Sequence, residues 1–144
     1  MKKDTRELVN QMISSNDIFE FTHNNEPEFV KYTLNGYLKK LLQNHNKRKM
    51  DVIKDSGLDI TYAYQIFDGR RKKPDREKLL QLALGFPLTL FETNCLLRIG
   101  GVNELYVRTK RDAILMYCLH QGCNLQECNI YLYNMDEVTV PKEE

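Results

Sequence analysis

Apolar residues recur at intervals of three and four positions along most of the chain, which is the spacing of side chains on one face of an α-helix. One such stripe runs through residues 4–22, and a second runs through residues 29–46. A glycine in the middle of a helix costs about 1 kcal/mol, so Gly36 moves the expected start of the second helix to Leu34 or Asn35. The pattern predicts an all-α protein.

Turn-forming and capping residues divide the next stretch into two short helices. The first is expected at residues 48–55 and ends before Gly57, which can adopt the left-handed conformation of a helix cap. Asp59 can cap a second helix over residues 60–67. The segment is therefore expected to form a helix, a tight turn and another helix.

Two further helices are expected after the basic loop RRKKP. Pro74 suits the approach to a leucine-rich helix over residues 75–84. Thr89 introduces another helix, which runs to about Ile99 and ends at Gly100.

Beyond these helices the chain repeats itself. At an offset of 35 residues, the segment that starts at Arg76 matches the segment that starts at Arg111 without gaps, and the helix-breaking centres GFPLT and HQGCN coincide. Two stacked helical hairpins are expected, although amphipathic helices also resemble one another by chance. The identical pairs are Arg76 and Arg111, Leu80 and Leu115, Leu84 and Leu119, Leu90 and Leu125, Glu92 and Glu127, Asn94 and Asn129, and Leu97 and Leu132.

The net charge of +1 conceals an uneven distribution of charge. Residues 1–33 carry four basic and six acidic side chains, residues 34–75 carry ten and five, and residues 76–144 carry seven and nine. The middle segment is therefore at +5 between two flanks at −2, and a polyanion would meet it first. A solvated charged face is the competing interpretation.

The composition of the chain indicates the cellular compartment in which the protein is expected. No apolar run approaches the roughly 20 residues that cross a bilayer, and the charged start MKKDTRELVN lacks the apolar core of a signal peptide. Four cysteines without an export signal fit a reducing compartment, in which thiols stay free. We expect a soluble, cytoplasmic protein without disulfides.

The stretch SGLDITYAYQIFDGRRKKPDREKLLQLA, within a match over about Leu34–Leu97, resembles the helix-turn-helix of the Cro/cI repressor, or XRE-type, family. The resemblance implies a lambda repressor-like helix-turn-helix core at residues 34–101, an N-terminal helical extension at residues 1–33 and a C-terminal helical hairpin at residues 102–144. It also implies a transcriptional regulator that binds specific sequences of double-stranded DNA.

The same resemblance assigns base contacts in the major groove to Ile60, Thr61 and Gln65. The chemistry of Gln65 suits this role, because its amide can both give and accept a hydrogen bond at adenine. Tyr62 has the reach for a phosphate oxygen, and basic residues bracket the helix on both sides. The expected phosphate contacts are Lys47, Arg48, Lys49, Tyr62, Arg70, Arg71, Lys72 and Lys73.

Several residues in this segment depart from the family pattern. Ile60, Tyr62 and Tyr64 make the expected recognition helix apolar and aromatic, and Asp68 places an acid where it would repel a phosphate. An apolar, aromatic helix face can equally dock a protein. An interaction adaptor that uses this face therefore remains the alternative to DNA binding.

Family members often bind two-fold DNA sites as dimers, so a homodimer is one expected assembly. The C-terminal hairpin could supply either the dimer surface or a surface for another protein partner. Its candidate residues are Tyr117, Tyr131, Leu132, Tyr133 and Met135.

The remaining chemistry points to binding rather than catalysis. No phosphate-binding loop or nucleophile motif is present, so neither an enzyme nor a cofactor is expected. The series Cys118, His120, Cys123 and Cys128 has the residue types of a zinc site but not a standard spacing. Buried free thiols are the favoured interpretation and zinc the alternative.

Overall fold

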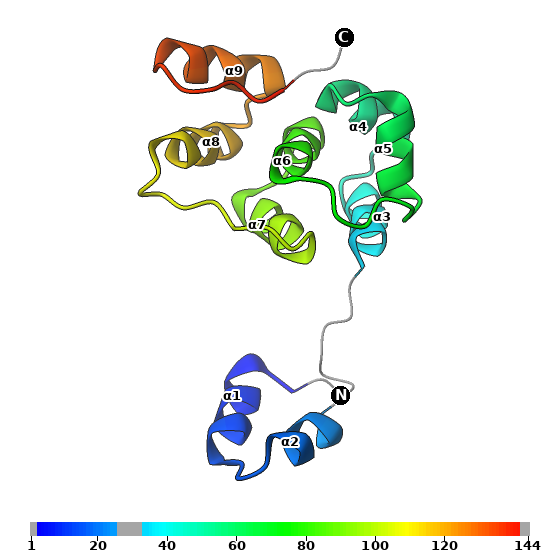
Figure 1. The fold of residues 1–144 in the computed structure, drawn as a ribbon, viewed down its shortest axis with the longest axis vertical. Coiled ribbons are helices and arrows are strands. Elements are labelled where there is room, and N and C mark those ends of the chain that lie inside the picture. The colour runs from blue at the N-terminus through cyan, green and yellow to red at the C-terminus, as the bar shows by residue number, and fades with distance from the viewer. Residues whose placement is uncertain (1–2, 26–32, 142–144) are drawn as a thin grey trace. The chain divides into compact units, whose positions relative to one another are not determined.

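The computed structural model describes residues 3–25 and 33–141, and its secondary structure in these ranges is entirely α-helical (Figure 1). This confirms the expected all-α class. Among the described residues, each helix is too short and too polar to cross a bilayer. The helices are α1 (Thr5–Ser14), α2 (Ile18–Asn24), α3 (Leu34–Asn44), α4 (Lys49–Ser56), α5 (Ile60–Phe67), α6 (Arg76–Gly85), α7 (Leu90–Ile99), α8 (Lys110–Gln121) and α9 (Leu125–Asn134).

The chain divides into two compact units, Met1–Lys31 and Tyr32–Glu144. The first unit contains α1 and α2, which together cover the apolar stripe at residues 4–22. Asp4 and Asp17 cap these two helices by accepting the N–H groups of Glu7 and Phe19. Neither helix contains a buried residue, so this unit has little core of its own.

In the second unit, α3 begins at Leu34, at the position that Gly36 predicted. Thr33 caps the helix, because its hydroxyl oxygen accepts the Gly36 N–H at 3.1 Å. Gly36 therefore lies in the first turn, where glycine costs little. A Cβ atom at this position would lie 2.9 Å from the same hydroxyl oxygen, so glycine also leaves room for the cap.

The predicted helix, turn and helix between residues 48 and 68 are formed by α4 and α5. Gly57 ends α4 in the left-handed conformation, with φ of +70°. The side chain of Leu58 then turns into the core, and Asp59 caps α5 by accepting the Tyr62 N–H at 3.0 Å. The expected bounds of α5 are confirmed, and those expected for α4 and α6 differ from the structure by one residue.

Helix α6 lies at the centre of the second unit and contacts α4, α7 and α9 (Figure 1). All residues from Leu79 to Gly85 are buried. The contact with α4 is especially close, since a Cβ atom on Gly85 would lie 2.8 Å from the Val52 carbonyl oxygen and 2.9 Å from the Ser56 Cβ atom. Any side chain at Gly85 would separate α4 from α6.

The predicted repeat is confirmed as two helical hairpins, α6–α7 and α8–α9. Helices α7 and α9 start and end at positions that are 35 residues apart. Each begins with a capping box, formed by Thr89 with Glu92 in the first hairpin and by Asn124 with Glu127 in the second. Both glutamates therefore stabilise the N-termini of their helices.

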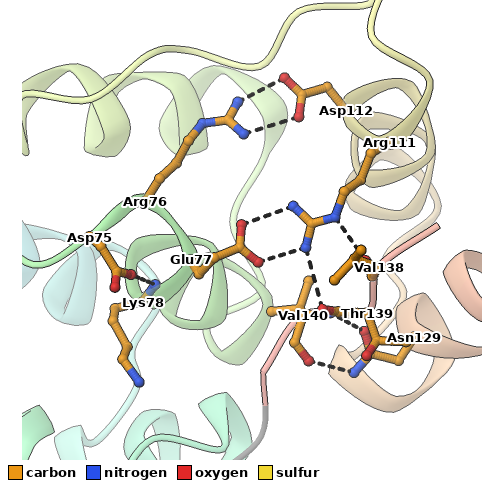
Figure 2. A network of polar contacts seen from close by, with 10 residues as sticks. All are labelled: Asp75, Arg76, Glu77, Lys78, Arg111, Asp112, Asn129, Val138, Thr139 and Val140. Carbon is orange, nitrogen blue, oxygen red and sulfur yellow. Dashed lines mark hydrogen bonds and ion pairs between the residues drawn. The ribbon is translucent and has the colours of Figure 1, made fainter.

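The hairpins are joined by two reciprocal ion pairs. The Arg76 guanidinium donates to both carboxylate oxygens of Asp112, at 3.1 and 2.8 Å, and the Arg111 guanidinium donates to both oxygens of Glu77, at 2.9 and 2.6 Å. Figure 2 shows that each arginine reaches the carboxylate of the other hairpin. Since Arg76 and Arg111 are equivalent, as are Glu77 and Asp112, the contact is pseudo-symmetric.

Each arginine also holds the chain that follows its own hairpin. Arg76 donates to the carbonyl oxygens of Asn103 and Glu104. Arg111 donates to those of Val138 and Thr139, again 35 residues further on, as Figure 2 shows. The two asparagines of the repeat act in parallel. The Asn94 side-chain oxygen accepts the Leu105 N–H, and the Asn129 side-chain oxygen accepts the Val140 N–H.

The Asp112 carboxylate is the most buried charged group of this network, with the residue only 5% exposed. Burial by itself would raise its pKa, but the hydrogen bonds from Arg76 and from the Tyr106 N–H, together with the charges of Arg76 and Arg111, lower it below its ordinary value. The hydrogen bond to Glu77 likewise raises the pKa of Arg111 against the opposing effect of burial. The network therefore stabilises the charged forms of Asp112 and Arg111.

We predict that Arg76→Gln lowers the free energy of unfolding by about 2–3 kcal/mol, because it leaves a buried carboxylate without its charged partner. Arg98→Gln is the matched control, since Arg98 pairs with Glu104 at 3.6 Å and both side chains are largely exposed. Its expected cost is below about 1 kcal/mol. Urea unfolding at pH 7 measures both values, and equal costs would contradict a structural role for the reciprocal pairs.

The lowered pKa of Asp112 predicts a pH dependence of stability. A carboxylate with a depressed folded-state pKa contributes stability above its unfolded-state pKa of about 3.9 and loses this contribution as the pH falls through the folded-state value. Asp112→Asn should therefore be less stable than the wild type at pH 7, and the difference should shrink below about pH 4. The exposed Asp51→Asn is the control, and a difference for Asp112→Asn that does not vary with pH would refute the assignment.

Candidate nucleic-acid interface

Helix α5 presents one face to the core and the opposite face to solvent. Ala63, Ile66 and Phe67 are buried. On the other face, Ile60 is 54% exposed and Thr61 is also exposed. The start of α5 is therefore accessible to a ligand, and its second turn packs into the core.

The ring of Tyr62 is covered by two cations. The guanidinium carbon of Arg71 lies 4.3 Å from the ring centroid, and the Lys78 Nζ lies 5.3 Å from it. Arg71 belongs to the basic loop after α5, while Lys78 lies on α6. These cation–π contacts bring the loop that follows α5 back onto the helix.

Tyr64 connects α5 to the start of α4. Its hydroxyl group donates to the Met50 sulfur at 2.8 Å. The Lys49 Nζ lies 5.6 Å from the Tyr64 ring centroid and 5.8 Å from that of Phe67. The first residues of α4 therefore also reach α5, although they are more than ten residues away in the sequence.

The side chain of Gln65 is half-buried at the edge of this surface. Its side-chain oxygen accepts a hydrogen bond from Arg71 Nε at 2.7 Å, and its backbone oxygen accepts the Arg71 N–H at 2.9 Å. The Gln65 Nε2 group has no hydrogen-bond partner among the described residues. The Gln65 side-chain oxygen is therefore hydrogen-bonded within the protein, and its Nε2 group can still donate to a ligand.

The acid in the basic loop is neutralised by its neighbour. The Arg70 Nη2 lies 2.7 Å from an Asp68 carboxylate oxygen, and the other oxygen accepts the Arg70 N–H at 3.0 Å. These hydrogen bonds with Arg70 lower the pKa of Asp68. Arg48 is similarly paired with Asp51 at 3.2 Å, at a fully solvated position. By contrast, Lys47, Lys72 and Lys73 are exposed and pair with no other described residue.

The cysteines of the second hairpin lie mainly in its core. Cys118 and Cys128 are fully buried, whereas Cys123 is partly exposed, and all four cysteines of the chain are free thiols. Burial raises the pKa of the Cys118 and Cys128 thiols. Within the described ranges, no group of three or more His, Cys, Asp or Glu side chains is arranged to hold a metal ion.

The sequence did not predict two sets of polar contacts. His45 Nε2 lies 2.9 Å from a carboxylate oxygen of Glu92 and connects the end of α3 to the start of α7. The hydrogen bonds from Thr89 and His45 outweigh the effect of burial and lower the pKa of Glu92. The reciprocal arginine pairs were also missed, although an acid follows Arg76 and Arg111 directly in the sequence and could have suggested them.

Taken together, α5 and the two basic segments form one surface, which we call the α5 surface. It contains the expected base-contacting residues and the expected phosphate-contacting residues, and its exposed part is cationic. Comparisons with protein-family models, with curated proteins and with solved structures found no match for this chain. The chemistry of the α5 surface is therefore the basis for assigning a function.

Proposed function

We propose that the protein is a transcriptional regulator that binds specific sequences of double-stranded DNA through a lambda repressor-like helix-turn-helix. Helix α4 is the first helix of the motif, and α5 is the recognition helix. One observation carries the proposal: Lys49 from before α5 and Arg71 from after it both contact rings on α5. Cations therefore flank an exposed helical turn on both sides, as phosphates flank the major groove.

In this proposal, Ile60, Thr61 and Gln65 meet the base edges. Thr61 and Gln65 are four positions apart and so lie on the same side of α5. Thr61 can bond to a base or contact a thymine methyl group, and the Gln65 amide can pair with adenine. Ile60 adds an apolar contact at the exposed start of the helix.

The cations around α5 supply affinity rather than specificity. Lys47, Lys72 and Lys73 are available to phosphates directly, and Lys49 and Arg71 adjoin the recognition helix. Arg48 and Arg70 would exchange an exposed carboxylate for a phosphate, which costs little because surface ion pairs are weak. Tyr62 presents its hydroxyl group to the backbone of the DNA. The proposed role involves no catalysis and places the protein in the cytoplasm, where its four thiols stay reduced.

The alternative, an adaptor that docks a protein on the aromatic face of α5, has weaker support. The Tyr62 ring is covered by Arg71 and Lys78, and the Tyr64 hydroxyl group is bonded to Met50. Ile60 is the only strongly exposed large apolar side chain on α5. A single isoleucine offers little area for a stable protein interface.

The second hairpin offers a separate surface for assembly. Tyr117 and Tyr131 are exposed and form an edge-to-face ring contact with centroids 5.6 Å apart. Their equivalents in the first hairpin, Leu82 and Leu96, are fully buried. Tyrosines in such a position are typical of interfaces, and we propose this pair for a homodimer or for a protein partner.

We predict that the protein binds random-sequence duplex DNA with a steep dependence on salt. If about six cations contact phosphates, the slope of log K against log salt is near −5. Lys72→Glu/Lys73→Glu should abolish this binding at about 50 mM salt, because it reverses two charges next to α5. Fluorescence anisotropy with a labelled duplex measures both effects.

Lys39→Glu/Lys110→Glu is the matched control for this experiment. It reverses the same number of charges outside the α5 surface and should retain most of the affinity. Specificity is tested by operator selection from a random library, with Thr61→Ala and Gln65→Ala compared at their adjacent base pairs. If the protein binds no duplex at low salt, the proposal is wrong and the alternative of a protein-binding adaptor is favoured.

Asp68→Asn should strengthen DNA binding. The substitution removes a charge that repels phosphates and releases Arg70 from its ion pair. We expect the affinity at about 100 mM salt to rise roughly threefold to tenfold, because one more cation becomes available. The control is Asp136→Asn, which removes an exposed acid from the second hairpin. If the two substitutions raise the affinity for DNA equally, the increase reflects the net charge of the protein and not the position of Asp68.

A further inference from the structure

A groove with a volume of about 650 Å³ lies between α4, the end of α6 and the start of α9. All of these elements belong to the unit Tyr32–Glu144 (Figure 1). Ligand sites typically have volumes of about 300–1,000 Å³ and often form where two substructures meet. Here the helix-turn-helix segment meets the second hairpin.

The groove has an apolar floor and an apolar wall. Leu84 from α6 and Leu125 from α9 line it while being almost completely buried. Ile130 and Tyr133 extend from α9 along the wall and are 56% and 74% exposed. Covering these side chains would remove a considerable apolar area from water.

The charge at the groove is positive. Lys47 and Lys54 both line it, and neither side-chain ammonium group forms a hydrogen bond or ion pair with another described residue. Asp55 is the only carboxylate among the lining residues.

We propose that this groove binds a small organic anion with an apolar body. The Lys47 and Lys54 ammonium groups hold the carboxylate, sulfonate or phosphate group of the ligand. Its body, roughly one or two rings in size, covers Leu84, Leu125 and Ile130. The groove shares Lys47 with the proposed DNA interface, but its other lining residues lie outside that interface and its test requires no DNA.

The test uses a matched pair of fluorescent probes that share an aromatic body. 8-Anilinonaphthalene-1-sulfonate carries the anionic group, and N-phenyl-1-naphthylamine lacks it. Titration of the full chain should show saturable binding of the sulfonate at one site, about tenfold or more tighter than binding of the neutral probe. Equal affinities for the two probes would overturn the proposal.

Variants separate the charge from the apolar wall. Lys47→Gln/Lys54→Gln should weaken binding of the sulfonate about tenfold and leave binding of the neutral probe unchanged, whereas Lys39→Gln should change neither. Ile130→Glu should abolish sulfonate binding, and Val107→Glu, at an exposed apolar residue outside the groove, should not. If the lysine variant binds like the wild type, the anionic group is not held in this groove.

The position of the bound probe is read from backbone amide resonances. Gly57 and Gly122 both line the groove and should show the largest shifts on addition of the sulfonate. Displacement of the probe separates the sources of the anion. 4-Phenylbutyrate or phenyl phosphate should displace it, whereas inorganic phosphate at the same concentration should not. Amide shifts confined to other glycines, or displacement by inorganic phosphate alone, would refute an amphipathic site at this position.

Discussion

The burial of α6 from Leu79 to Gly85 is the constraint on which the larger unit depends. Residues Leu79–Gly85 have no exposed face, because α4, α7 and α9 pack around the same helix. Gln81, which is fully buried in this run, donates to the Ser56 carbonyl oxygen at 3.2 Å and so ties α6 to the end of α4. Its side-chain oxygen has no partner among the described residues, so the contact with α4 is retained at the cost of an unsatisfied acceptor. The orientation of the helix-turn-helix segment follows from this central helix.

The second hairpin repeats the first in its polar contacts but not in its surface. The capping boxes, the arginines and the asparagines occupy equivalent positions and form equivalent bonds. These polar groups determine the geometry of each hairpin, because each group has few possible partners and its hydrogen bonds require a narrow range of directions. The apolar positions are freer, so Leu82 and Leu96 are fully buried whereas Tyr117 and Tyr131 are exposed. The equivalent positions of the two repeated hairpins therefore contribute to the core in the first hairpin and to the exposed surface in the second.

The α5 surface shows how a short helix can be both anchored and available. Its buried residues pack into the core, and the rings of Tyr62 and Tyr64 serve as attachment points for cations from both flanking segments. The two tyrosines therefore organise positive charge around α5. The acid in the same loop is held by Arg70 and so presents less net repulsion to an anion than the sequence alone suggested.

The sequence by itself determined the helices, their caps and the 35-residue repeat. Asp59, Thr89 and Asn124 act on N–H groups within three residues, and the apolar stripes reflect the period of one helix, so both can be recognised locally. Only the tertiary structure decided that Arg76 meets Asp112, that Lys49 and Arg71 converge on α5, and that Lys47 and Lys54 share a groove with α9. These contacts join segments that lie far apart in the chain, and their partners depend on how the helices pack around α6. Local patterns specify which faces are apolar, but the direction in which two helices cross is set by side-chain packing over the whole core.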